Sequence, residues 1–416
     1  MSQGQFRLAR RIERTESSAV REILKVTERP EVISFAGGLP AQELFPVDEL
    51  ERAISKVLQR DRGVALQYST TEGYYPLREW IVQRLKLWGC NVTPDEILIT
   101  SASQQGIDLT AKVFIDPGDA VVFGRPTYLA ALQTFGSFEA RFVSVETDEE
   151  GLVVEEVEEA LIRERPKLIY VTPNFSNPAG ITLSAERRIR LVELAARHRV
   201  PILEDDPYGE LRFRGQFIPP MKASDLDDMV IYLSTFSKIL SPGIRLGWLA
   251  LPREIYGNFV VAKQATDLHS STLTQRAVMQ YLRDNSIDEH IAEMRRMYGE
   301  RCQAMLDALE HYFPEGSSWT KPEGGLFLWA RLPDGLAAEA VFIRALQDHV
   351  AIVPGASFFP EGEPHHFMRM NFSHQPLERI TEGIRRLGAA IEAEMTARTM
   401  TSSTSRTRDV AKLLRR

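Results

Sequence analysis

Short apolar runs alternate with longer amphipathic stretches between residues 96 and 251. The apolar runs cover residues 97–99, 120–123, 168–171, 200–203, 230–233 and 247–250. Short runs that are apolar throughout are typical of strands buried on both faces, whereas the stretch 185–198 repeats its apolar residues at the period of a helix. This alternation predicts a mostly parallel sheet with helices packed on both of its faces.

The pattern changes after residue 273. Helical periodicity predicts helices over 274–283, 288–311, 338–347 and 377–395, and apolar runs predict strands over 326–329, 351–353 and 367–370. These elements indicate a second, smaller α+β domain. Residues 396–416 are rich in Ser, Thr and Arg, and we expect a mobile tail there.

Composition narrows the class of protein. The 416 residues are 44% hydrophobic and 26% charged, which is typical of a soluble globular protein with two domains. The net charge of -7 gives no reason to expect nucleic acid or an anionic membrane as a partner, and no apolar run approaches the roughly 20 residues of a membrane-spanning helix. Cys90 and Cys302 lack metal-like spacing, and the N-terminus lacks the apolar core of a signal peptide, so we expect a cytoplasmic protein.

A lysine follows one of the predicted strands in a segment rich in hydroxyl groups. Lys238 comes after Ser234, Thr235 and Ser237, and Arg245 follows shortly afterwards. A lysine amine forms a Schiff base with an aldehyde cofactor, while hydroxyls and an arginine hold a phosphate. A solvated surface lysine explains the same segment when it is considered alone.

Polar clusters follow two other strands, where ligands bind in parallel sheets. Ser101 and Ser103 open a predicted helix, whose N-terminus suits an anion, although either hydroxyl also serves as an ordinary helix cap. Asn174 and Asn177 lie in a segment with Pro and Gly, and an ordinary turn explains about half of this pattern. Either asparagine amide is also suited to hydrogen-bond a ligand oxygen.

Three acids, residues 204–206, follow a further strand and precede Tyr208. They fit a solvated loop, a metal site or a carboxylate paired with a protonated pyridine nitrogen. Since the nearest histidine, His198, precedes the strand and so lies at its opposite end, we predict no metal site. Arg369 lies in an apolar strand, where it needs either a salt bridge or a substrate carboxylate as its partner.

In combination and in this order, these segments resemble the fold-type I pyridoxal-phosphate aminotransferases. The resemblance covers about residues 18–393 and is strongest to the 2-aminoadipate and kynurenine aminotransferase branch, on the basis of residues 20–25 and 235–238. The matching segments are residues 33–40, 67–69 with 72–73, 103–105, 177–180, 205–208, 237–238 with Arg245, and Arg369.

The resemblance implies an aspartate-aminotransferase-like α/β fold. Residues 46–275 are expected to form a large cofactor-binding domain with a mostly parallel, seven-stranded sheet flanked by helices. Residues 276–395 are expected to form the small α+β domain, and residues 1–45 an N-terminal arm and helix that pack with the small domain and with a dimer partner.

The resemblance also implies roles around pyridoxal phosphate. Lys238 forms the Schiff base and then moves a proton at the substrate's alpha carbon, which requires a neutral amine with a lowered pKa. Asp205 pairs with the pyridine nitrogen. Asn177 and Tyr208 hydrogen-bond the phenolic oxygen of the ring, and Tyr128 stacks on its face.

The remaining implied contacts hold the phosphate and the substrate. The phosphate-binding residues are Ser103, Gln104, Thr235, Ser237 and Arg245, together with Tyr68 from the neighbouring subunit of a homodimer with shared sites. Arg369 binds the substrate's α-carboxylate, with Asn177 and the backbone near Gly38. Arg21 falls where 2-aminoadipate-type relatives meet an acidic side chain; a solvated helix face explains that position equally well.

The predicted activity is transfer of the amino group of an L-amino acid (2-aminoadipate, aromatic or aliphatic) to 2-oxoglutarate by a ping-pong mechanism. One alternative is another pyridoxal-phosphate reaction, such as that of a lyase or decarboxylase, because the same residues serve it. The other is a ligand-sensing regulator; it is disfavoured because we expect too few residues before Ile33 for a DNA-binding domain and because the net charge is negative.

Overall fold

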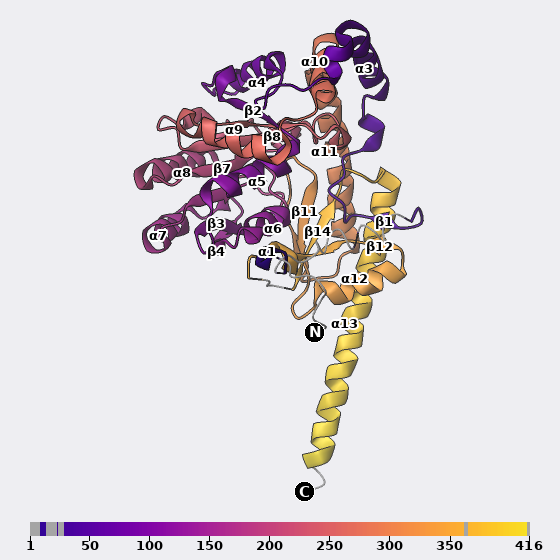
Figure 1. The fold of residues 1–416 in the computed structure, drawn as a ribbon. Coiled ribbons are helices and arrows are strands. Elements are labelled where there is room, and N and C mark those ends of the chain that lie inside the picture. Colours follow the sequence, from indigo (N-terminus) through magenta and orange to yellow (C-terminus); the bar gives the residue numbers. More distant parts are fainter. Residues whose placement is uncertain (1–8, 14–22, 24–28, 362–364, 414–416) are drawn as a thin grey trace.

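The computed structural model describes residues 9–13, 23, 29–361 and 365–413. Its larger part is built on an eight-stranded mixed sheet (Figure 1). In spatial order the strands are β2 (Ile97–Thr100), β9 (Gly247–Ala250), β8 (Val230–Thr235), β7 (Ile202–Asp205), β6 (Leu168–Val171), β3 (Ala120–Arg125), β4 (Arg141–Asp148) and β5 (Gly151–Leu152). The five strands β8, β7, β6, β3 and β4 are parallel, and β9 and β5 pair antiparallel with their neighbours.

The mostly parallel α/β sheet that the sequence predicts is confirmed, but it has eight strands rather than seven. The two-residue strand β5 adds to the edge of β4 because Gly151, at φ 95°, lets the chain reverse directly after β4. Periodicity missed β4 itself because its buried and exposed residues alternate at the edge of the sheet. β7 begins at Ile202 instead of residue 200, since Pro201 has no N–H for the ladder.

Helices cover both faces of this sheet. On one face lie α5 (Ala102–Phe114), α6 (Leu129–Ser137) and α9 (Arg253–Asp267), and on the other lie α4 (Tyr75–Leu87), α7 (Val154–Glu164) and α8 (Ala185–His198). Val121 packs with the first set and its neighbour Val122 with the second, so both faces of β3 are buried. Each such aliphatic side chain contributes about 1.5–3 kcal/mol by leaving water, which is why the central strands are apolar throughout.

The second part is a four-stranded antiparallel sheet with helices, which confirms the expected smaller α+β unit. Its strands are β10 (Ser318–Trp319), β11 (Phe327–Arg331), β14 (Phe367–Asn371) and β13 (Val353–Pro354), and its helices are α11 (Ile287–Tyr312), α12 (Ala338–Gln347) and α13 (Leu377–Leu413). The single strand predicted over 351–353 is divided at Ile352. Its first half, β12 (Val350–Ala351), pairs instead with β1 (Ile33–Ser34).

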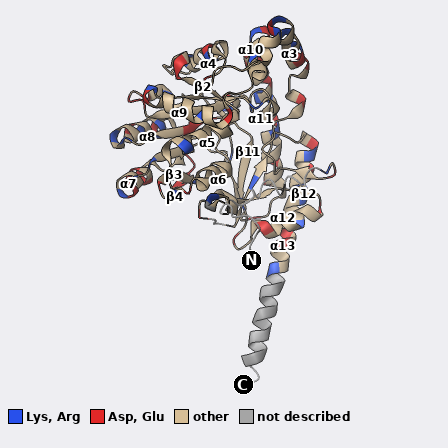
Figure 2. Cartoon of the chain, viewed as in Figure 1, with Lys and Arg blue, Asp and Glu red and all other residues tan. Residues whose placement is uncertain are grey.

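Three further α-helices belong to the described chain. The short helix α1 (Arg10–Glu13) lies near the N-terminus, and α3 (Val47–Asp61) packs along α10 (Thr272–Asp284). Figure 1 shows α13 running out of the body to Leu413, and the mobile tail expected for residues 396–416 stays a prediction, as do the domain boundaries. Figure 2 shows basic and acidic residues side by side on the outer helices. None of the helices described is long and apolar enough to cross a membrane.

Gly106 lets α5 approach β8 closely, since a Cβ there would lie 2.3 Å from Leu233 Cδ1. Gly257, in the neighbouring helix α9, has nothing within 4 Å of the same position. We therefore expect G106A to destabilise the fold by about 1–3 kcal/mol through overpacking. G257A should stabilise it by about 0.5–1 kcal/mol through its better helix propensity. Urea unfolding midpoints of both variants check this, and midpoints shifted in the same direction would contradict it.

Candidate active site

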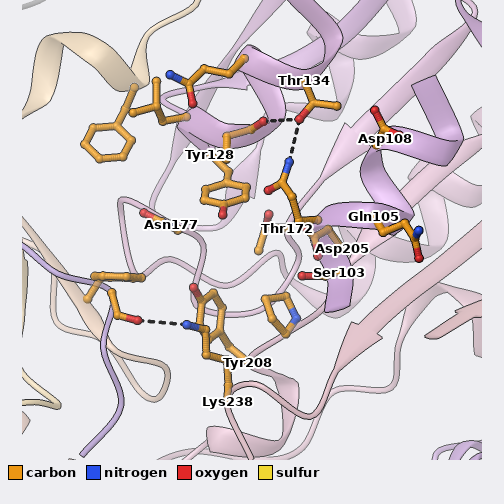
Figure 3. A pocket seen from close by; sticks show the side chains of 18 of the residues that line it. Ser103, Gln105, Asp108, Tyr128, Thr134, Thr172, Asn177, Asp205, Tyr208 and Lys238 are labelled. Atoms are coloured by element: carbon orange, nitrogen blue, oxygen red, sulfur yellow. Dashed lines mark hydrogen bonds between the residues drawn. The ribbon is translucent and has the colours of Figure 1, made fainter. Parts of the chain in front are cut away.

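A cavity of about 760 Å³ opens at the carboxyl end of β6 and β7 and is closed on the far side by β11 and β14. This volume is typical of sites for small organic ligands. The predicted site residues that line it are Gly38, Ser103, Gln104, Tyr128, Asn177, Asp205, Tyr208, Lys238, Arg245 and Arg369. Figure 3 shows Lys238 and Tyr208 on the side opposite Tyr128, with Ser103 of α5 at another edge.

Lys238 follows β8 and projects into this cavity. Its Nζ donates to the carbonyl oxygen of Gly38 at 3.0 Å, which joins the segment after β1 to the sheet. Burial lowers the pKa of Lys238 to about 8, and the nearby positive charges of Arg369 and Arg245 add to the effect. A lysine with such a pKa has an appreciable neutral fraction near physiological pH, as a nucleophile or proton carrier requires.

Asp205 ends β7 and is buried at the floor of the cavity. Its Oδ2 accepts a hydrogen bond from Tyr170 at 2.7 Å, whereas its Oδ1 has no partner among the residues described. Burial raises the pKa of Asp205 to about 7. A buried carboxylate oxygen without a donor is costly, so this atom calls for a cationic or N–H ligand.

The two acids beside Asp205 serve the fold instead. Asp206 accepts from Asn174 Nδ2 at 2.9 Å and from Tyr232 at 3.3 Å, and Glu204 accepts from the backbone N–H groups of Met221 and Lys222. Successive side chains of a strand point to opposite faces, so Asp205 faces away from both neighbours.

Arg369, on β14, is almost fully buried at the wall formed by the smaller sheet. Its guanidinium lies over the rings of Phe327 and Phe358, at 4.4 and 5.0 Å, and donates to Asn177 Oδ1 at 2.8 Å and to the carbonyl oxygen of Ala36 at 2.6 Å. Burial lowers its pKa to about 10, which leaves it charged at neutral pH. In the described part of the chain no carboxylate pairs with it, so the salt-bridge alternative is not found there.

The residues expected around the phosphate divide into two groups. Ser103 and Gln104 stand in the first turn of α5 at the cavity, and Gln104 Nε2 donates to Thr134 of α6 at 2.7 Å. Thr235 and Ser237 are buried outside the cavity lining, where Thr235 Oγ1 lies 2.9 Å from both Ser237 Oγ and the carbonyl oxygen of Leu246. Their placement as phosphate ligands stays a prediction.

One predicted residue, Tyr68, lies elsewhere, and another is not described. Tyr68 is 78% exposed and packs edge-to-face on His269 with ring centroids 5.8 Å apart. It does not line the cavity of its own chain. Arg21 lies outside the described residues.

Several side chains that contact the site residues or the cavity were not predicted, and four of them bear on its chemistry. Thr172, Phe327 and Phe358 line the cavity, and Tyr170 holds Asp205 from below. Thr172 carried a usable signal, since it directly follows a predicted strand. Phe358 carried none, because nothing local to its sequence distinguishes it from other core phenylalanines.

Comparison with known proteins identifies what the geometry resembles. The family described as aminotransferase class I and II matches residues 30–387. "Aromatic-amino-acid aminotransferase 1" of Thermococcus litoralis is 44% identical, over 91% of this chain and 92% of that protein.

Two solved structures are similar over the whole fold. Kynurenine aminotransferase of Pyrococcus horikoshii, in complex with PMP, has a TM-score of 0.89 and 42% identity over 93% of this chain and 97% of that one. Alpha-aminoadipate aminotransferase of Thermus thermophilus, complexed with N-(5'-phosphopyridoxyl)-L-leucine, has a TM-score of 0.87 and 40% identity over 94% and 98%.

The cavity of this chain fits pyridoxal phosphate. The unpartnered Asp205 Oδ1 suits the protonated pyridine nitrogen, which would supply both a donor and a positive charge. The amine of Lys238 is available to the aldehyde, and the first turn of α5 with Arg245 offers a place for the phosphate. These three features would serve three of the polar groups of that one molecule.

The lowered pKa of Lys238 makes the stability of the cofactor-free protein depend on pH. The unfolded lysine keeps its proton up to a pKa of about 10.5, but the folded one releases it near 8, so the wild-type protein gains stability as pH rises between these values. We expect K238M to be more stable at pH 7 by up to about 3 kcal/mol, with the difference shrinking towards pH 10.5. Urea unfolding of both proteins at several pH values measures this; a constant difference would contradict it.

Proposed function

Since this chain belongs to the class I and II aminotransferases and is a pyridoxal-phosphate-dependent transaminase, we propose that it transfers amino groups from 2-aminoadipate and aromatic L-amino acids, and also from aliphatic ones, to 2-oxoglutarate by a ping-pong mechanism. The proposal rests chiefly on the environment of Arg369. This residue is a buried cation without a carboxylate partner among the described residues, and it faces the same cavity as Lys238.

The walls of the cavity support this range of donors. Leu129, Phe327 and Phe358 line it with apolar surface that suits an aromatic or aliphatic side chain. Proteins similar to this chain are named for aromatic amino acids, kynurenine and 2-aminoadipate. An acidic side chain needs a cation as well, and for that contact we propose Arg21.

The residues of the chain divide the work as follows. Bound pyridoxal phosphate supplies an electron sink that acidifies the proton on the substrate's alpha carbon. Arg369 holds the α-carboxylate through its planar fork, and Asn177 fixes the orientation of that fork. Lys238 carries the proton from the alpha carbon, which its lowered pKa permits.

Other side chains set the electrostatics. Asp205, which accepts a hydrogen bond from Tyr170, would keep the pyridine nitrogen of the cofactor protonated. The positive charge of that nitrogen would in turn lower the pKa of Asp205 and favour its ionised form. Tyr208, whose pKa is raised by burial, stays a neutral hydrogen-bond donor for the phenolic oxygen. Tyr128 and Gly38 both line the cavity, where Tyr128 would pack against the cofactor ring and the backbone near Gly38 would contact the substrate.

We propose a homodimer in which Tyr68 completes the partner's phosphate site. Support comes from the exposure of this segment: Val64, Leu66 and Tyr68 are each more than 60% exposed, at 62%, 68% and 78%. Three large side chains exposed together suit burial against a second copy.

Spectroscopic titration tests the reaction. We expect glutamate, 2-aminoadipate, kynurenine and phenylalanine each to convert the loaded cofactor to its pyridoxamine form, and 2-oxoglutarate to reverse the change. R21A should weaken 2-aminoadipate about tenfold, the worth of one charge-assisted hydrogen bond, and leave phenylalanine unchanged. A spectrum that no donor shifts, or amine or ammonia released without an oxo acid, would overturn the proposal.

Subunit mixing tests the shared site. K238A and Y68A homodimers should each be strongly impaired, since one lacks the reactive amine and the other lacks a phosphate contact. If Tyr68 acts on the partner's site, one site of a mixed dimer contains both substitutions and the other site contains neither. Co-refolding equal amounts should therefore restore about a quarter of wild-type activity, the statistical share of intact sites. No recovery in verified mixed dimers would show that Tyr68 acts within its own chain.

A further inference from the structure

Lys263 is a fully buried lysine on α9 that has no part in the reaction proposed above. Its Nζ contacts Asp267 Oδ1 and Oδ2 at 2.9 and 3.0 Å, Gln105 Oε1 at 3.0 Å and Ser270 Oγ at 3.0 Å. Three acceptor groups match the three N–H donors of an ammonium. Burying a charge is expensive unless it is fully satisfied, so the arrangement requires all of these contacts together.

The contact with Gln105 determines how that amide is turned. An ammonium only donates, so the oxygen of Gln105 must face Lys263, and the same oxygen accepts from the backbone N–H of Ser101 at 2.8 Å. The amide nitrogen then points to Asp267 Oδ2, at 2.8 Å. A Gln105 side chain turned the other way would place its NH2 group against both Lys263 and the Ser101 N–H.

This amide holds a strained turn. Ala102, the first residue of α5, has φ 65°, a left-handed conformation that costs a residue with a Cβ roughly 1 kcal/mol or more. The turn is pinned on both sides, by the bond from Ser101 N to Gln105 and by a bond from Thr100 Oγ1 to the carbonyl oxygen of Ala102 at 3.0 Å. The strained turn sets the direction in which α5 starts.

The direction of α5 matters because its first turn lines the cavity. Ser103 and Gln104 lie there, and the first N–H groups of a helix have no partner within it. Figure 3 shows Ser103 and Gln105 on this same turn, so a change in the Gln105 contacts moves the backbone that carries Ser103.

We propose that Lys263 is a positioning residue for the cofactor phosphate: through Gln105 it holds the first turn of α5 in the orientation that presents Ser103 and the free N–H groups to that phosphate. The inference rests on the proposed function, which places the phosphate at this turn. A buried ion pair that only stabilises the fold would act on all ligands alike, whereas a positioning residue acts on the phosphate alone.

The experiment compares pyridoxal phosphate with pyridoxal, which lacks the phosphate, in absorbance titrations of cofactor-free K263M and wild type. We expect K263M to bind pyridoxal phosphate about tenfold more weakly and pyridoxal within twofold of wild type. K112M is the matched control, because Lys112 of α5 also contacts α9, through Thr266, but from an exposed position about two turns beyond Gln105, and its ion pair is with Asp108. It should change neither affinity. Equal weakening of both ligands by K263M would overturn the inference.

A second variant distinguishes positioning through Gln105 from a direct electrostatic effect of the Lys263 charge on the phosphate. It also provides a test if K263M does not fold. Q105M breaks the link but keeps the ion pair, and it should show the same loss for the phosphate ligand alone. In a Q105M background, K263M should add no further loss, because both changes cut one path. An additional loss of pyridoxal phosphate affinity when K263M is added to Q105M, or a Q105M protein with wild-type affinities, would overturn the inference. Wild type that binds neither ligand would instead refute the proposed function.

Discussion

Asp205 is a buried carboxyl group with only half of its hydrogen bonds made within the described protein, and the site is arranged around that deficiency. Tyr170 satisfies one oxygen, the other has no partner, and burial raises the pKa to about 7. Such a group is a cost to the fold that a cationic ligand removes. On the function proposed above, this cost to stability is offset when the cofactor binds.

The same logic applies to the two cations of the cavity. Lys238 and Arg369 are positive groups near each other, and the pKa of each is lowered, chiefly by burial. For Lys238 the result is a reactive amine, whereas Arg369 keeps its charge and so its capacity to bind a carboxylate. One cavity thus holds a partly neutral amine and a charged guanidinium, because the guanidinium has much the higher intrinsic pKa.

Both parts of the fold are needed for these contacts. Lys238 and Asp205 come from the large sheet, while Arg369 comes from β14 of the small one and reaches Asn177, 192 residues earlier in the chain. The first turn of α5 is likewise contacted from α9, where Lys263 donates a hydrogen bond to Gln105 across 158 residues. The chemistry of the site lies at the strand ends, but the side chains that orient it come from elements distant in sequence.

What the sequence determined by itself was therefore local. Continuous apolar runs indicated buried strands, the polar residues after them indicated a ligand edge, and the order of Asn177, Asp205, Lys238 and Arg369 indicated the family. These features depend on neighbouring residues and on period, which a single chain displays directly.

The tertiary structure decided the rest. It placed Asp205 in the lining of the cavity, whereas Glu204 and Asp206 point the other way and hydrogen-bond within the protein. It also supplied the contacts of Tyr170 with Asp205 and of Lys263 with Gln105, which lie 35 and 158 residues apart in the chain. No local pattern encodes such contacts, since they exist only once the strands have paired and the helices have packed.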